Sequence, residues 1–102
     1  MDLKLYAIID SFLEYKGASK NKEFEVTVIT SSKNRPQKNH NTFIVVKNDI
    51  SKDCYTFDFT DDKMREDLGG FVLMDANYLK DLKFDGEALS FSTDRGVKIT
   101  IL

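Results

Sequence analysis

Residues 2–16, DLKLYAIIDSFLEYK, decide the fold, because their apolar side chains recur at the i, i+3, i+4 spacing of an amphipathic helix. Asp2 is suited to cap the start of this helix, and Gly17 follows Lys16 at the point where a helix would stop. The start of the stretch also alternates between apolar and polar positions, so a strand is the alternative. The apolar face of the predicted helix consists of Leu5, Ile8, Ile9, Phe12 and Leu13.

The next stretch predicts a sheet for this helix to cover. Residues 23–32, EFEVTVITSS, alternate between apolar and polar side chains, which is typical of a half-buried strand. We expect Tyr55, Phe57 and Phe59 to share one face of a later strand and to form part of the core. The further strands are expected at residues 42–47, 54–60, 71–74, 88–93 and 97–102.

Two short helices are expected in the second half of the chain. One covers residues 61–68 and ends at Gly69 and Gly70, and the other follows Asp75, with Leu79 and Leu82 facing inward. Because the chain lacks βαβ crossovers, we predict an α+β fold. It has one N-terminal amphipathic helix packed on a mainly antiparallel five- to six-stranded sheet, with one or two short helices in the second half. A length of 102 residues fits a single domain over residues 1–102.

The connections are predicted from their polar and turn-forming residues. Residues 33–41, KNRPQKNHN, contain no apolar side chain and carry the single proline of the chain, which indicates an exposed, mobile loop. Asp85-Gly86 is a dipeptide typical of tight hairpins. A second hairpin is expected at residues 94–96, where Gly96 suits a left-handed backbone conformation.

The sequence also predicts where the protein resides. No apolar run approaches the roughly 20 residues that a membrane span needs, and the first residues do not resemble a secretory leader. Cys54 is the single cysteine, which fits a reducing compartment. We therefore expect a cytoplasmic protein without a membrane segment.

Residues suited to catalysis are scarce. His40 is the single histidine, and its predicted position in a mobile loop works against the geometry of a general base. Cys54 follows Asp53, a carboxylate that disfavours the thiolate. One histidine and one cysteine cannot build a zinc site, and glycine motifs that hold phosphates are absent. We expect a protein that is not an enzyme and that uses no cofactor and no metal.

The charges are divided unevenly along the chain. The net charge is −2, yet residues 1–52 hold nine basic and six acidic side chains, whereas residues 53–102 hold six basic and eleven acidic ones.

The favoured hypothesis is a non-catalytic protein-binding or inhibitor module, similar in its general mode of action to immunity proteins and phage anti-defence inhibitors. It would present an acidic surface to a basic partner such as a nuclease. The acidic residues of this surface would be Asp58, Asp61, Asp62, Glu66 and Asp67, and its apolar anchors would be Met64 and Tyr78.

The alternative hypothesis is a small accessory protein that binds nucleic acid through residues 33–41. Lys33, Arg35 and Lys38 could hold phosphates. Alternating aromatic residues such as those at positions 55, 57 and 59 can stack on bases, but they more often form the core face of a sheet.

The strand expected at residues 97–102 raises the question of self-association. An unpaired edge here would favour aggregation, so we expect this strand to be paired. The sequence leaves open whether its partner is an internal strand or a second copy of the chain in a homodimer.

Overall fold

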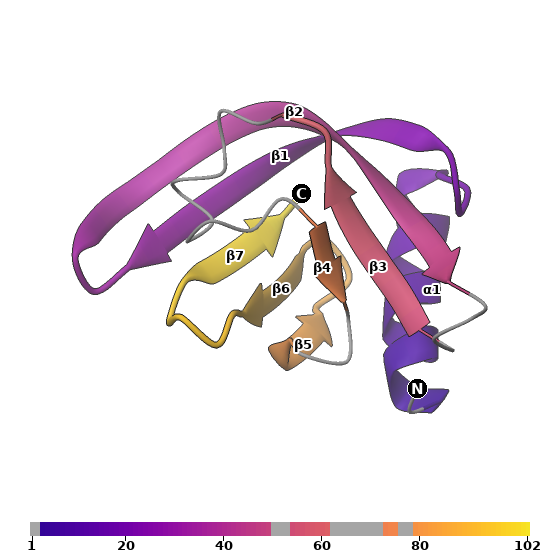
Figure 1. Cartoon of the computed structure of the whole chain (residues 1–102). Coiled ribbons are helices and arrows are strands. Elements are labelled where there is room, and N and C mark those ends of the chain that lie inside the picture. The colour runs from indigo at the N-terminus through magenta and orange to yellow at the C-terminus, as the bar shows by residue number, and fades with distance from the viewer. Residues whose placement is uncertain (1–2, 50–53, 62–72, 76–78) are drawn as a thin grey trace.

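In the described part of the chain, one helix is followed by seven strands. A computed structural model describes residues 3–49, 54–61, 73–75 and 79–102 (Figure 1). The elements are α1 (Leu3–Lys16), β1 (Glu23–Ser32), β2 (Arg35–Asp49), β3 (Cys54–Phe59), β4 (Leu73–Asp75), β5 (Lys80–Phe84), β6 (Leu89–Ser92) and β7 (Lys98–Ile101). The N-terminal helix and the antiparallel sheet confirm the α+β prediction.

All seven strands belong to one sheet with the order β4-β3-β2-β1-β7-β6-β5. Each neighbouring pair is antiparallel. The C-terminal strand β7 lies between β1 and β6, so the expectation that it is paired is confirmed and both of its partners are internal. A homodimer through this strand would have to displace one of them.

The sheet curls around its own core. Phe57 of β3 and Phe91 of β6 stack with ring centroids 5.6 Å apart, although three strands lie between β3 and β6 in the sheet. In a flat sheet with strands about 4.8 Å apart, the four steps from β3 to β6 would separate these positions by about 19 Å. The concave face of the curled sheet therefore encloses the core. We call the opposite, convex side the outer face.

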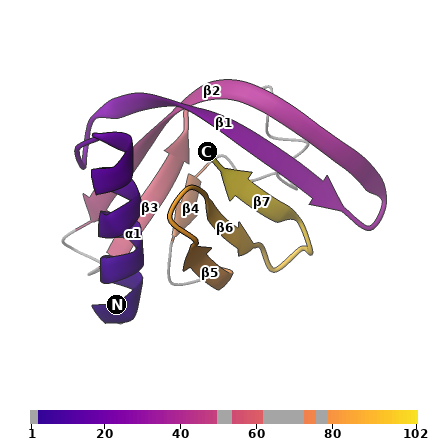
Figure 2. The same ribbon diagram turned by 180° about the vertical axis from the view of Figure 1, so that it is seen from behind.

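Helix α1 packs against both β3 and β5, which lie toward opposite ends of the sheet (Figure 2). Tyr6 makes an edge-to-face contact with Tyr55 of β3, with ring centroids 4.8 Å apart. Phe12 makes a similar contact with Phe84 of β5 at 5.9 Å. Full burial of an apolar side chain contributes about 1.5 to 3 kcal/mol. The fully buried side chains of the helix are Ile9, Phe12 and Leu13, three of the five on its predicted apolar face.

The alternation of apolar residues in the strands is confirmed by their burial. Val26, Val28 and Thr30 of β1 are buried, and the intervening residues are at least partly exposed. On β3, Tyr55, Phe57 and Phe59 are all buried in the core. These aromatic rings are therefore structural and offer no surface for stacking bases.

The prediction of an exposed, mobile loop over residues 33–41 is wrong. Strand β2 begins at Arg35, and the connection from β1 is a tight turn at residues 33 and 34. Backbone pairing with β1 imposes the extended conformation despite the polar sequence, from Ser32 opposite Arg35 to Glu23 opposite Val45. Pro36 is tolerated because it lies opposite a register shift between Thr30 and Ser32.

The second half of the chain also differs from the prediction. Residues 80–84 form strand β5 where a short helix was expected, because Leu82 and Phe84 alternate into the core while β6 supplies backbone partners. The helix expected over residues 61–68 lies outside the described residues. The sheet has seven strands where five or six were expected.

Both hairpin turns of the C-terminal half are confirmed. Asp85 Oδ1 accepts hydrogen bonds from the backbone N–H groups of Glu87 and Ala88, at 2.9 and 2.8 Å. These bonds favour the ionised carboxylate and lower the pKa of Asp85. Gly96, with φ of +78°, closes the turn between β6 and β7 in the left-handed conformation that favours glycine.

Candidate functional site

Two of the residues predicted to form the acidic surface, Asp58 and Asp61, lie in the described part of the chain. Asp58 lies on the outer face of β3, where its carboxylate forms an ion pair of 2.9 Å with Lys47 and its side chain is 28% exposed. Asp61 follows at the end of this strand and is partly buried. The ion pair neutralises Asp58 locally. The residues that lie outside the described part of the chain are Asp62, Met64, Glu66, Asp67 and Tyr78.

The three predicted basic residues are exposed at the β1–β2 hairpin. Lys33 lies in the turn, whereas Arg35 and Lys38 lie on β2. Lys38 pairs with Thr30 and Arg35 pairs with Ser32, two residues further along β1, so both lie opposite positions on the inner side of β1. The surrounding sequence adds to the positive character of the hairpin, since residues 26–48 contain no aspartate or glutamate.

The sheet register brings three further lysines together on the outer face. Ser92 of β6 pairs with Lys98 on one side and Lys80 on the other, while Ser90 pairs with Lys83. Both serines alternate with buried residues of β6 and are partly exposed, so they point away from the core. The three lysines surround the two serines and are all exposed.

This lysine cluster continues to β1. Ser31 of β1 pairs with Lys98. We call this surface the basic face, and its residues are Lys80, Lys83, Lys98, Ser31, Ser90, Ser92 and Thr100.

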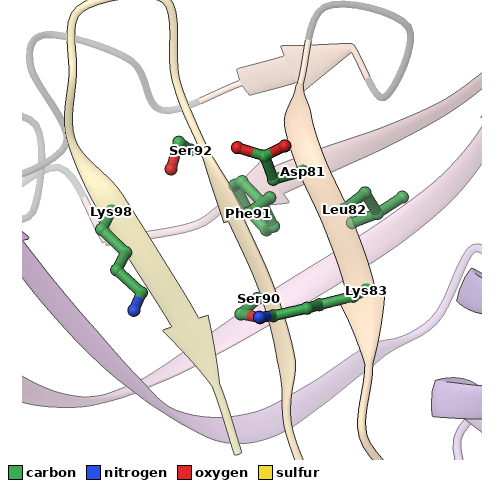
Figure 3. A pocket seen from close by; sticks show the side chains of 7 residues that line it. All are labelled: Asp81, Leu82, Lys83, Ser90, Phe91, Ser92 and Lys98. Atoms are coloured by element: carbon green, nitrogen blue, oxygen red, sulfur yellow. The ribbon is translucent and has the colours of Figure 1, made fainter.

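A groove of about 520 Å³ lies within the basic face (Figure 3). It owes its shape to a β-bulge in β5, where the pairing shifts between Lys80 and Lys83 and Asp81 adopts a φ of +56°. The carboxylate of Asp81 and the hydroxyl of Ser92 lie on the same side of the strands in Figure 3. The lining residues are Asp81, Leu82, Lys83, Ser90, Phe91, Ser92 and Lys98.

On β1 and β3 the acids of the outer face lie away from the lysine cluster, whereas Asp81 of β5 lies within it. Glu23 and Glu25 are exposed at the start of β1, and Val45 of β2 pairs with both Glu23 and Asp58. The acids of β1 and β3 thus lie at the opposite end of β1 from Ser31. A protein with a small net charge can still attract an anion to one end in this way, because local fields depend on how the charges are distributed.

The lysines at positions 80, 83 and 98 were missed by sequence reasoning. Alternation along β6 and β7 is sufficient to place Ser90, Ser92 and Lys98 on an outer face. Nothing in the local sequence indicates that β7 lies beside β1, and this non-local pairing joins the lysines to the hairpin.

A polar cluster between α1 and β3 has a structural role. The buried Tyr55 hydroxyl donates a 2.7 Å hydrogen bond to Asp10 Oδ1 and accepts one of 3.1 Å from Lys20 Nζ. Burial, followed by the bond to Asp10, raises the pKa of Tyr55, and the bond to Tyr55 raises the pKa of Lys20. A tyrosine that holds its proton more tightly is a poor catalytic base. The cluster therefore ties the helix and the loop after it to the sheet.

His40 belongs to a strand and not to a loop. His40 lies in β2 opposite Val28, so its predicted place in a mobile loop is wrong. No helix in the described part of the chain combines the length and apolar character that crossing a membrane requires.

The comparisons with known proteins provide no further guide to the site. No protein-family model matches this chain, and searches among curated proteins and among solved structures found no significant match.

Proposed function

We propose that this protein is a non-catalytic nucleic-acid-binding protein that holds the phosphate backbone of a single strand on the basic face. The observation that carries the proposal is the clustering of Lys80, Lys83 and Lys98 around Ser90 and Ser92, which the sheet register produces. Lysines neutralise phosphates, and serine hydroxyls donate hydrogen bonds to phosphate oxygens.

The dimensions of the basic face suit a short length of single strand. From β5 to β1 the face crosses three strand spacings, or roughly 14 Å. The three cations Lys80, Lys83 and Lys98 are distributed over this distance. No aromatic side chain belongs to the basic face as defined, because Phe91 points into the core. We therefore expect backbone recognition with little preference for base sequence.

The acidic-surface hypothesis has less support from the described residues. It relied on a group of free carboxylates, and Asp58 is engaged by Lys47. A variant with Asp61→Lys and Asp62→Lys separates the two hypotheses. Nucleic-acid binding through the basic face is expected to persist in this variant or to strengthen slightly, whereas capture of a basic protein partner would be lost.

Salt dependence of binding tests the proposal. With three phosphate contacts on a single strand, the logarithm of the association constant should fall with the logarithm of salt concentration with a slope of about −2. The measurement is fluorescence anisotropy of a labelled oligonucleotide of about twelve nucleotides, within the site sizes known for single-strand binders. Lack of binding at low salt, or a slope near zero, would contradict the proposal.

A control variant distinguishes the basic face from the hairpin tip. Lys33→Ala combined with Lys38→Ala removes two positive charges, one from the β1–β2 turn and one from the inner side of β2. We expect this variant to keep most of its affinity and nearly the whole slope. A loss as large as that caused by altering the basic face would move the site to the hairpin tip.

A further inference from the structure

The acidic residue of the groove is unexpected on a surface that binds phosphates. Asp81 faces the groove together with Lys83 and Lys98, and a carboxylate at this position repels a phosphate. It also lies in the left-handed region of the backbone map, which is uncommon for residues other than glycine. The fold thus holds an acceptor-only group among donors, and a ligand that offers a donor would satisfy it.

Asp81 has no side-chain partner among the described residues that would give its carboxylate a structural role. Unlike Asp58, Asp81 makes no ion pair or side-chain hydrogen bond with the part of the chain that the structure describes, and it is exposed. The groove of about 520 Å³ beside it is much larger than a water molecule, whose share of liquid volume is about 30 Å³. A ligand group can therefore enter the groove and reach this carboxylate.

We infer that the groove selects RNA over DNA, with Asp81 accepting a hydrogen bond from a ribose 2′-hydroxyl while Lys83 and Lys98 hold the adjacent phosphates. This inference rests on the proposed function and specifies its ligand. The 2′-hydroxyl is the donor that repeats along an RNA backbone and that DNA lacks. Recognition of the sugar and phosphates also agrees with a face that has no aromatic platform.

The expected selectivity follows from the cost of leaving the carboxylate without a partner. When RNA binds, the 2′-hydroxyl replaces the water that Asp81 loses, but with DNA this carboxylate loses water and gains no hydrogen bond. A hydrogen bond to a charged group at an exposed position supports a preference for RNA of about tenfold over DNA of the same base sequence.

Two substitutions test the role of Asp81 without straining its backbone. Asp81→Gly removes the acceptor and suits a positive φ, and Asp81→Asn keeps an acceptor oxygen and tolerates the same φ. Both should bind RNA a few-fold more tightly, because a negative charge is gone, and DNA should gain more affinity than RNA, because its binding no longer leaves a carboxylate without a partner. The preference for RNA should vanish in Asp81→Gly and should remain at a few-fold in Asp81→Asn.

Asp94→Asn is the matched control, since it removes a negative charge from the exposed β6–β7 turn, outside the lining of the groove. It should keep the tenfold preference. The dissociation constants of paired RNA and DNA oligonucleotides are measured by fluorescence anisotropy at one low salt concentration. Equal binding of RNA and DNA by the unaltered protein, or an unchanged preference in Asp81→Gly, would overturn the inference while leaving the proposed function intact. Absence of binding to both would overturn both.

Discussion

Replacing Phe57 by alanine should lower the free energy of unfolding by about 3 to 5 kcal/mol, which is the usual cost of removing a large aromatic side chain from a core. Phe57 is fully buried on β3, and its ring stacks on Phe91 of β6 across the curl of the sheet. The substitution therefore removes a contact between strands that are not neighbours and leaves a cavity where they meet. Since native domains are stable by only about 5 to 15 kcal/mol, the variant should be close to unfolding.

Phe43→Ala provides the control for this experiment. Phe43 lies on the neighbouring strand β2, but its side chain points to the outer face and is 45% exposed. Its loss should cost less than about 1 kcal/mol, because much of its surface is already in water. Urea unfolding followed by circular dichroism gives both values. Equal costs for the two variants would contradict a core enclosed by a curled sheet.

Reversing two charges of the basic face, with Lys83→Glu and Lys98→Glu, should weaken oligonucleotide binding at low salt by at least about a hundredfold. The change removes two of three proposed phosphate contacts and replaces them with repulsion, and like-charge contacts cost several kcal/mol. With one contact left, the salt slope should also fall to about a third of its original value. Both side chains are exposed on strands, so we expect the fold to be retained.

The control for this reversal changes the net charge by the same amount at another place. Lys4→Glu with Lys22→Glu alters two exposed lysines, one in α1 and one just before β1. Neither belongs to the basic face, so the expected loss of affinity is only a few-fold, from the change in overall charge. If the two double variants lose affinity equally, binding depends on net charge alone and the basic face has no special role.

Local patterns in the sequence were sufficient to predict the elements in which the spacing of apolar residues or a turn dipeptide determines the conformation. The spacing of Ile9, Phe12 and Leu13 predicted the helix and its buried face. Alternation predicted β1, and the dipeptide Asp85-Gly86 predicted a hairpin turn whose hydrogen bonds the structure shows. In these cases the favoured local conformation and the final packing agree.

Prediction failed where pairing between strands overrides local preference. The polar residues 35–41 have little tendency to form a strand, yet β1 supplies backbone partners along most of this stretch. Leu79 and Leu82 have helical spacing, yet pairing with β6 makes residues 80–84 a strand with a bulge. The position of the basic face also depends on pairing between strands distant in sequence, because Lys98 lies beside Ser31 only through the pairing of β7 with β1.

The most direct test of the basic face is an NMR titration of the labelled protein with a short single-stranded RNA, in which each backbone amide reports its own contact. We expect the largest chemical-shift changes at Ser90, Ser92 and Lys98, with smaller changes at Ser31 and Thr100. The amides of the outer face near Glu23 and Asp58 should remain nearly unchanged. Changes centred on β3, or none at RNA concentrations well above that of the protein, would contradict the account.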